Sequence, residues 1–289
     1  MKTTRIALLV VATLALAACQ EAAAPTSPSP EPSVDPSQAV LDAMVAAYEA
    51  GTVHQEFRMD VSAGAQSFSF SGEADFDYDR RRGAMSMDLG VLGGEVDMIV
   101  DGTVTYMRSP AFAKQVPTEW VKMDLAKVDP KAAAQLGGGG MVDPSAYVNL
   151  FAGAVDVSEG GTEEVGGVAT TRYEGTIDMR KAVDRFPAIL GREAGTSARK
   201  ALEESLDQLE ALGVDAEIPF EIWIDDEGLP RRQRIAMDFG GLVPGAEDAS
   251  MEIQVDFSAF GEPIDVDVPK DREVTDLTAA LSAEASVQG

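Results

Sequence analysis

Hydrophobic and polar residues alternate without a break over residues 67–78. Successive side chains point to opposite faces of a β-strand, so this pattern predicts a strand with one apolar and one polar face. Phe68, Phe70 and Phe76 lie on the apolar face. Gly72 has no Cβ atom and marks a point where so long a strand can bend. The rest of the chain is expected to extend this apolar face with further strands or to cover it with helices.

The same alternation recurs on both sides of this segment and predicts an antiparallel sheet. The further strands are expected at residues 52–61, 83–89, 95–100, 103–107, 120–124, 165–177, 218–224, 231–239 and 251–257. Short turns such as Asp101-Gly102 are typical of β-hairpins. Strands joined in this way, polar on one side, give a sheet with one face in water and one face buried.

Helical spacing of apolar residues appears in other segments. Residues 38–50, 178–190 and 196–212 are predicted helices, and 130–135 and 143–151 are shorter ones. Ser37 is expected to cap the first helix and Gly51 to end it.

The N-terminus has the features of an export signal. Lys2 and Arg5 precede an apolar run, residues 6–18, that is too short to span a membrane as a helix. The run ends in Leu16-Ala17-Ala18-Cys19, which resembles the lipobox of bacterial lipoprotein signal peptides. That resemblance implies a signal peptide over 1–18, and a diacylglycerol thioether on Cys19 as the membrane anchor. The alternative is an ordinary signal peptide in which the cysteine occurs by chance.

Composition then divides the remainder into a tether, a domain and a tail. Residues 19–37 are rich in Pro, Ser and Ala and contain almost no large apolar side chain, so they predict a disordered tether. No comparable linker interrupts 38–270, which is expected to be a single domain. Residues 271–289 are expected to be a tail that is partly helical or disordered.

Charge and residue types exclude several functions. The chain carries 49 acidic and 23 basic residues, a net charge of −26, which disfavours nucleic acid and anionic lipid headgroups as partners. Cys19 is the only cysteine and His54 the only histidine, so neither thiol catalysis nor a transition-metal site is expected. We expect no cofactor and no enzyme activity. Two alternatives stay open: a glycosidase-like pair of carboxylates, and weak cation binding at residues 225–228.

Several motifs resemble the actinobacterial LppX/LprAFG-type lipoproteins. They are Asp101-Gly102 with Tyr106, the segment Trp120-Val-Lys-Met-Asp124, the segment from Phe220 to Arg232 with its Asp-Glu-Gly turn, and the segment from Phe257 to Val266. The resemblance covers residues 40–270 and implies a fold like LolA and LolB. That fold is α+β, a curved antiparallel sheet or half-barrel with helices over its concave apolar face and a cavity for acyl chains.

The pattern and the resemblance together nominate a set of cavity-lining residues, named below the predicted lining residues. They are Phe57, Met59, Phe68, Phe70, Phe76, Met85, Met87, Met98, Ile222, Ile235 and Met237. The implied function is a lipid or glycolipid carrier on the outer side of the cytoplasmic membrane, in the cell envelope. The alternative is a structural or interaction lipoprotein with a filled core and no cargo. No protein partner follows from the sequence.

Overall fold

The computed structural model describes residues 35–90, 93–128, 148, 150–185, 203, 204, 206, 207, 210, 216–239 and 248–280. The chain divides into two compact units, Met1–Ser33 and Val34–Gly289. Every contact described below lies within the second unit, so that unit holds its fold together by its own contacts.

The described strands all belong to one sheet. In chain order they are β1 (Thr52–Ala63), β2 (Gln66–Asp77), β3 (Arg82–Asp88), β4 (Glu95–Asp101), β5 (Val104–Arg108), β6 (Trp120–Asp124), β7 (Ala154–Val165), β8 (Val168–Asp178), β9 (Glu217–Asp225), β10 (Pro230–Asp238), β11 (Ser250–Ser258) and β12 (Val274–Asp276). The described helices are α1 (Pro36–Glu49), α4 (Met179–Arg185) and the short 3-10 helices η2 (Phe112–Lys114) and η3 (Asp271–Glu273).

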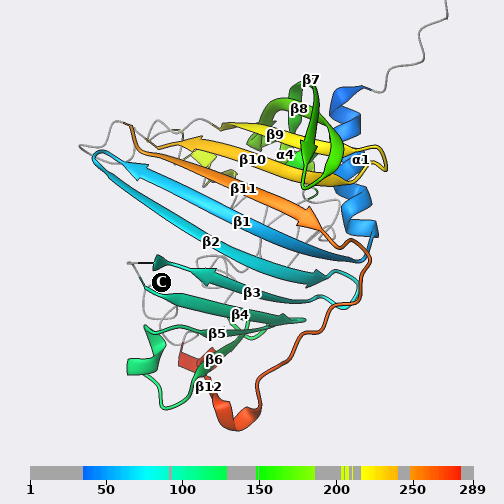
Figure 1. The fold of residues 1–289 in the computed structure, drawn as a ribbon. Coiled ribbons are helices and arrows are strands. Elements are labelled where there is room, and N and C mark those ends of the chain that lie inside the picture. The colour runs from blue at the N-terminus through cyan, green and yellow to red at the C-terminus, as the bar shows by residue number, and fades with distance from the viewer. Residues whose placement is uncertain are drawn as a thin grey trace, which may run out of the picture. The chain divides into compact units, whose positions relative to one another are not determined.

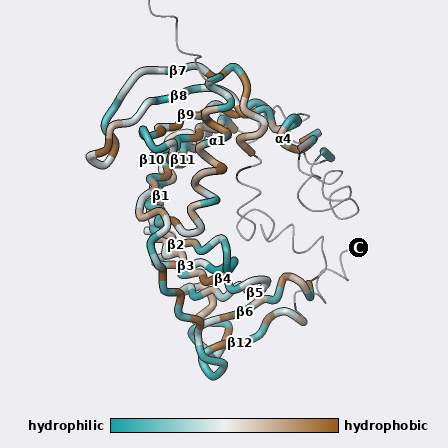
Figure 2. Tube along the Cα trace, turned by 90° about the vertical axis from the view of Figure 1, so that its right-hand side faces the viewer, coloured by the Kyte–Doolittle hydropathy of each residue, from teal (hydrophilic) through white to brown (hydrophobic). Residues whose placement is uncertain are grey.

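Two meanders meet at the centre of this sheet (Figure 1). The spatial order is β12-β6-β5-β4-β3-β2-β1-β11-β10-β9-β8-β7, so β1 pairs with β2 on one side and with β11 on the other. After β6 the chain passes to the opposite edge and returns strand by strand to β1. All described pairings are antiparallel except that of β12 with β6. The sheet is curved and α1 lies inside the curve (Figure 2), which confirms the predicted fold class.

A cluster of buried apolar residues lies where α1 packs against β7, β9 and β10. Val40 and Met44 of α1 are buried against Ile222, together with Phe151 and Phe220. The rings of Phe151 and Phe220 meet edge to face with centroids 5.3 Å apart. Burying one such large apolar side chain stabilises the fold by about 1.5–3 kcal/mol. This half of the concave face is therefore filled by the protein itself.

The structure corrects several expected boundaries. Helix α1 begins at Pro36 rather than at residue 38, because Asp35 and not Ser37 caps it by accepting the Ser37 N–H at 2.8 Å. Strand β7 was not expected, since most of its side chains are polar and exposed. Residues 274–276 are also not tail but strand β12.

Other expectations are only partly within the described residues. Residues 203, 204, 206, 207 and 210 are helical, in agreement with the helix expected at 196–212. Residues 148, 150 and 151 are helical within the segment expected at 143–151. The helix expected at 130–135, the signal peptide over 1–18 and Cys19 lie outside the described residues. No helix in the described part of the chain has the length and apolar character needed to cross a membrane.

Candidate apolar binding face and cavity

The strand registers place the predicted lining residues on one face of the sheet. Four rows of paired residues run across the strands: Ile222–Gln233–Val255–Phe57–Gly72–Met87, Ile235–Ile253–Met59–Phe70, Met237–Met251–Val61–Phe68 and Ala74–Met85–Met98–Met107. Phe76 pairs with Val53 and Gly83 on the same face. Side chains of directly paired residues share a face of a sheet, so these rows form one largely apolar surface on the side that carries α1, with the buried Gln233 as its polar member.

Burial differs across this surface. Ile222, which lies in the core under α1, is fully buried, and Met98 is 7% exposed. The other predicted lining residues, among them Phe57, Met59 and Met87, are only half-buried. The concave face is thus closed at the α1 side, while much of the rest keeps accessible apolar side chains.

A cavity of about 550 Å³ opens at one end of β9 and β10. Its apolar lining comes from Met179 of α4, from Leu206, and from Ile218, Met237 and Phe239 of the sheet. Met237 is the predicted lining residue in this set. The sequence pattern did not indicate Met179 or Leu206, because they reach the cavity through the packing of helical segments on the sheet.

Carboxylates accompany this apolar lining. Glu210, Glu217 and Asp238 also line the cavity and all three are exposed. Arg180 of α4 donates from Nε to Glu210 Oε1 at 2.9 Å and from Nη2 to Asp207 Oδ1 at 2.9 Å. The hydrogen bonds that Arg180 donates, to Glu210 first and to Asp207 second, raise the pKa of Arg180 above its ordinary value. Arg180 thus links α4 to Asp207 and Glu210 beside the cavity.

Asp178 positions the start of α4 and hence Met179. Its Oδ1 accepts the backbone N–H of Lys181 at 3.0 Å, and its Oδ2 lies 3.1 Å from Lys181 Nζ. The backbone N–H of Lys181, followed by its ammonium group, holds the pKa of Asp178 below the ordinary value. A carboxylate with a lowered folded-state pKa stabilises the fold above its unfolded-state pKa, and that contribution is lost as pH falls through the folded-state pKa.

Replacing Asp178 by alanine is therefore expected to lower the free energy of unfolding near pH 7 by about 1 kcal/mol, the size of a helix-cap effect. Near pH 3 the difference between variant and parent should shrink, because the parent carboxylate is then losing its charge. Urea denaturation at both pH values measures this. Asp267→Ala, at an exposed position, is the control. A deficit that is equal at both pH values would contradict the assigned role.

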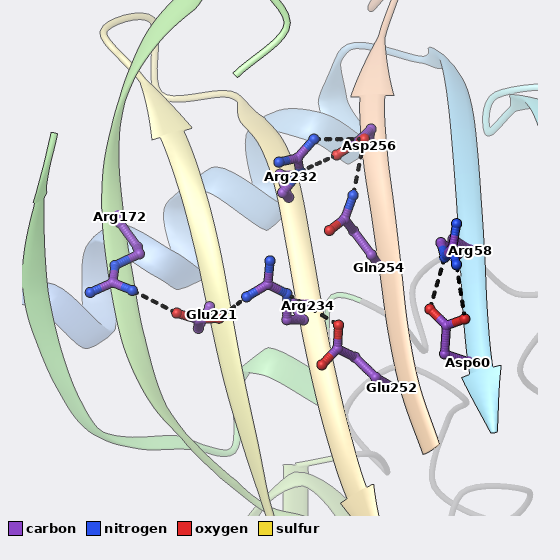
Figure 3. Close-up of polar contacts among 9 residues, drawn as sticks. All are labelled: Arg58, Asp60, Arg172, Glu221, Arg232, Arg234, Glu252, Gln254 and Asp256. Atoms are coloured by element: carbon purple, nitrogen blue, oxygen red, sulfur yellow. Dashed lines mark hydrogen bonds and ion pairs between the residues drawn. The ribbon is translucent and has the colours of Figure 1, made fainter. Parts of the chain in front are cut away.

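The opposite, convex face is polar and is held by ion pairs across the strands (Figure 3). Arg172 Nη1 donates to Glu221 Oε1 at 2.8 Å, and Arg234 Nη1 donates to Glu221 Oε2 at 2.7 Å. Arg234 also lies 3.5 Å from Glu252 and stacks over the ring of buried Trp223. The hollow of about 800 Å³ on this face is bordered mainly by polar groups. We therefore place the candidate site for an apolar ligand on the concave face.

The described part of the chain offers few groups for metal binding or for acid–base chemistry. No set of three His, Cys, Asp or Glu side chains there is arranged to hold a metal ion. His54 lies on the polar face, with Nδ1 2.8 Å from Asp75 Oδ1. Asp225 belongs to a hairpin turn and is engaged by that turn's own N–H groups.

Comparison with known proteins gives likenesses of fold. No protein-family model matches the chain, and no curated protein does. Among solved structures, the Mycobacterium tuberculosis lipoprotein LppX is 17% identical with a TM-score of 0.47, over 80% of this chain and 98% of that one. LprF from Mycobacterium bovis is 14% identical with a TM-score of 0.49, over 81% and 96%.

A LolA-superfamily protein from Nitrosomonas europaea is 8% identical with a TM-score of 0.31, over 82% of this chain and 96% of that one. LppX and LprF are proteins of the type that the sequence motifs resemble.

Proposed function

We propose that this protein is an exported lipoprotein, anchored through Cys19 to the outer face of the cytoplasmic membrane, that binds lipid acyl chains and carries lipid. The observation that carries the proposal is the largely apolar cavity of about 550 Å³, which shares Met237 with the half-buried apolar rows of the concave face. Ligand sites in proteins are commonly apolar hollows of roughly 300–1,000 Å³.

The energetics of such binding require no catalysis. Each methylene group removed from water contributes about 0.8 kcal/mol, so an acyl chain gains enough free energy to leave water for the cavity. Part of this gain is offset by the loss of translational and rotational freedom on binding. The expected tether, residues 19–37, would reach at most about 55 Å at about 3.1 Å per residue, and would hold the domain near its lipid source.

A structural or interaction lipoprotein without cargo is the second candidate. The observation that favours it is the filled core under α1, where Val40 and Ile222 are fully buried. The two candidates differ in whether the remaining apolar surface holds a ligand.

Native mass spectrometry separates them. The chain from Gln20 onward retains every described residue and, lacking Cys19, carries no lipid anchor of its own. If this form is purified from a lipid-containing host without detergent, we expect lipid masses bound to the protein. Their consistent absence, together with no uptake of added lipid, would favour the second candidate.

Replacing Ala216 by tryptophan is expected to weaken acyl-chain binding by about tenfold or more. Ala216 lines the cavity, and an indole there takes the space of several methylene groups, each of which contributes about 0.8 kcal/mol when buried. Titration with a fluorescent fatty-acyl probe measures the change. Ser67→Trp adds the same indole at an exposed polar-face position and should leave binding unchanged. Equal affinity of the two variants would place the ligand elsewhere.

A further inference from the structure

Methionine is distributed unevenly over the two faces of the sheet. The described strands contain eight methionines, and the pairing registers put all eight on the concave face and none on the convex face. None of these strands contains leucine, so methionine provides the long, flexible apolar side chains of the concave face. The eight are Met59, Met85, Met87, Met98, Met107, Met123, Met237 and Met251.

Most of these methionines are accessible to a small molecule in water. Seven of the eight are half-buried, and the eighth, Met98, is 7% exposed. From Gln20 onward the chain contains no cysteine, so no thiol competes for an oxidant. A peroxide that reaches this domain therefore meets methionine as the only residue type that contains sulfur, and it meets the strand methionines on the candidate binding face.

Two half-buried methionines line the cavity itself. Met237 comes from β10 and Met179 from the start of α4. Oxidation turns the apolar thioether of methionine into a polar sulfoxide. An acyl chain that fills the cavity would strip water from such a group, and burying a polar group without a hydrogen-bond partner is costly. A sulfoxide at either position therefore opposes binding of the chain to the neighbouring apolar residues Leu206, Ile218 and Phe239.

We propose that Met179 and Met237 are oxidation sites that control lipid release, because their conversion to sulfoxides makes the cavity unfavourable for an acyl chain. In each reaction the sulfur lone pair attacks one oxygen of hydrogen peroxide. A sulfur–oxygen bond forms, the oxygen–oxygen bond breaks, and the departing hydroxide takes the proton of the transferred oxygen and leaves as water. Sulfur is oxidised and the peroxide is reduced. The inference rests on the proposed function, because it concerns release from the same cavity.

The test treats the chain from Gln20 onward with hydrogen peroxide, removes the oxidant and titrates pyrene-labelled hexadecanoic acid. Binding should be about tenfold weaker than before treatment, as expected when a polar group must be buried without a partner. Peptide mass spectrometry should find an added oxygen on Met179 and Met237, and probe bound during treatment should slow this oxidation. Met44 is 2% exposed and should stay unoxidised while the domain is folded. Treatment with both epimer-specific methionine sulfoxide reductases and a thiol reductant should restore the affinity.

Two double variants locate the effect, each compared with its own affinity before treatment. Met179→Leu with Met237→Leu removes both sulfur atoms and nearly conserves side-chain volume, so peroxide should change its affinity by less than about twofold. Met107→Leu with Met123→Leu makes the same exchange at half-buried positions of β5 and β6, near the other edge of the sheet. This variant should lose affinity on peroxide treatment as the parent does.

The outcomes separate this inference from the proposed function. Unchanged affinity despite sulfoxides at Met179 and Met237, or failure of these two residues to oxidise, would overturn the inference and leave lipid binding standing. An equal loss in the two double variants would assign the effect to other methionines and overturn the two sites. Loss of binding together with oxidation of Met44 would attribute release to unfolding and overturn them as well. A probe that does not bind before treatment would overturn both proposals.

Discussion

Replacing Gly72 by alanine is expected to destabilise the domain by about 3 kcal/mol, a large loss for one methyl group. A Cβ atom at this position would lie 2.2 Å from the backbone oxygen of Ser86 and 2.5 Å from Cζ of Phe57. The backbone oxygen belongs to the neighbouring strand β3 and cannot move without breaking the pairing of Gly72 with Met87. Equilibrium denaturation in urea measures the loss, with circular dichroism to check that the variant folds.

Gly102→Ala is the matched comparison. Gly102 has a positive φ of 64°, but nothing lies within 4 Å of the position that a Cβ atom would occupy. Only backbone strain acts there, so the expected cost is about 1 kcal/mol. If the two variants lost equal stability, the close approach of β2 and β3 at Gly72 would not be a constraint on the sheet.

The sequence predicted the strands that have one polar and one apolar face. Residues 67–78 alternate strictly, and β2 covers nearly the same positions. Strand β7 escaped prediction because both of its faces meet water along most of its length, so no alternation develops. Strand β12 is three residues long and is held by parallel pairing to β6, a partner about 150 positions earlier in the chain that no local pattern reveals.

The candidate site was predictable to the extent that it depends on strand alternation. Phe57, Met59 and Phe70 share a face because side-chain direction in a strand has a period of two residues, and the pairing registers join them into rows. The cavity depends instead on where α4 and residue Leu206 pack against the strand ends. Such long-range packing leaves no periodic signal in the sequence. For this reason Met237 is the one predicted lining residue that also lines the cavity with Met179 and Leu206.

The carboxylates of one turn were recognised in the sequence, but their role was left open. The turn at residues 225–228 contains three adjacent carboxylates, for which weak cation binding stayed an alternative to a plain hairpin turn. In the structure Asp225 Oδ1 accepts the backbone N–H groups of Glu227 and Leu229, both at 2.9 Å. Its Oδ2 accepts from Arg231 Nε at 2.6 Å, while the Arg231 guanidinium lies over the ring of Phe260.

Removing the Asp225 carboxylate is therefore expected to cost about 3–5 kcal/mol of unfolding free energy, the largest effect predicted for this chain. The Asp225 side chain is only 3% exposed, and the Arg231 side chain 20%. Asp225→Ala would deprive a largely buried cation and two turn N–H groups of their acceptor, and leaving such groups unpaired is what makes the change costly. Denaturation in urea at neutral pH measures the loss.

Asp226 provides the control, because it is the adjacent residue and its side chain is exposed. Asp226→Ala removes the same group from the same turn, and we expect a change within about 0.5 kcal/mol. Asp225→Asn retains one carbonyl acceptor and should fall between the two. This order follows if Asp225 organises the β9–β10 hairpin and its contact with Phe260. If Asp225→Ala were no more harmful than Asp226→Ala, the hairpin would owe its geometry to backbone pairing alone.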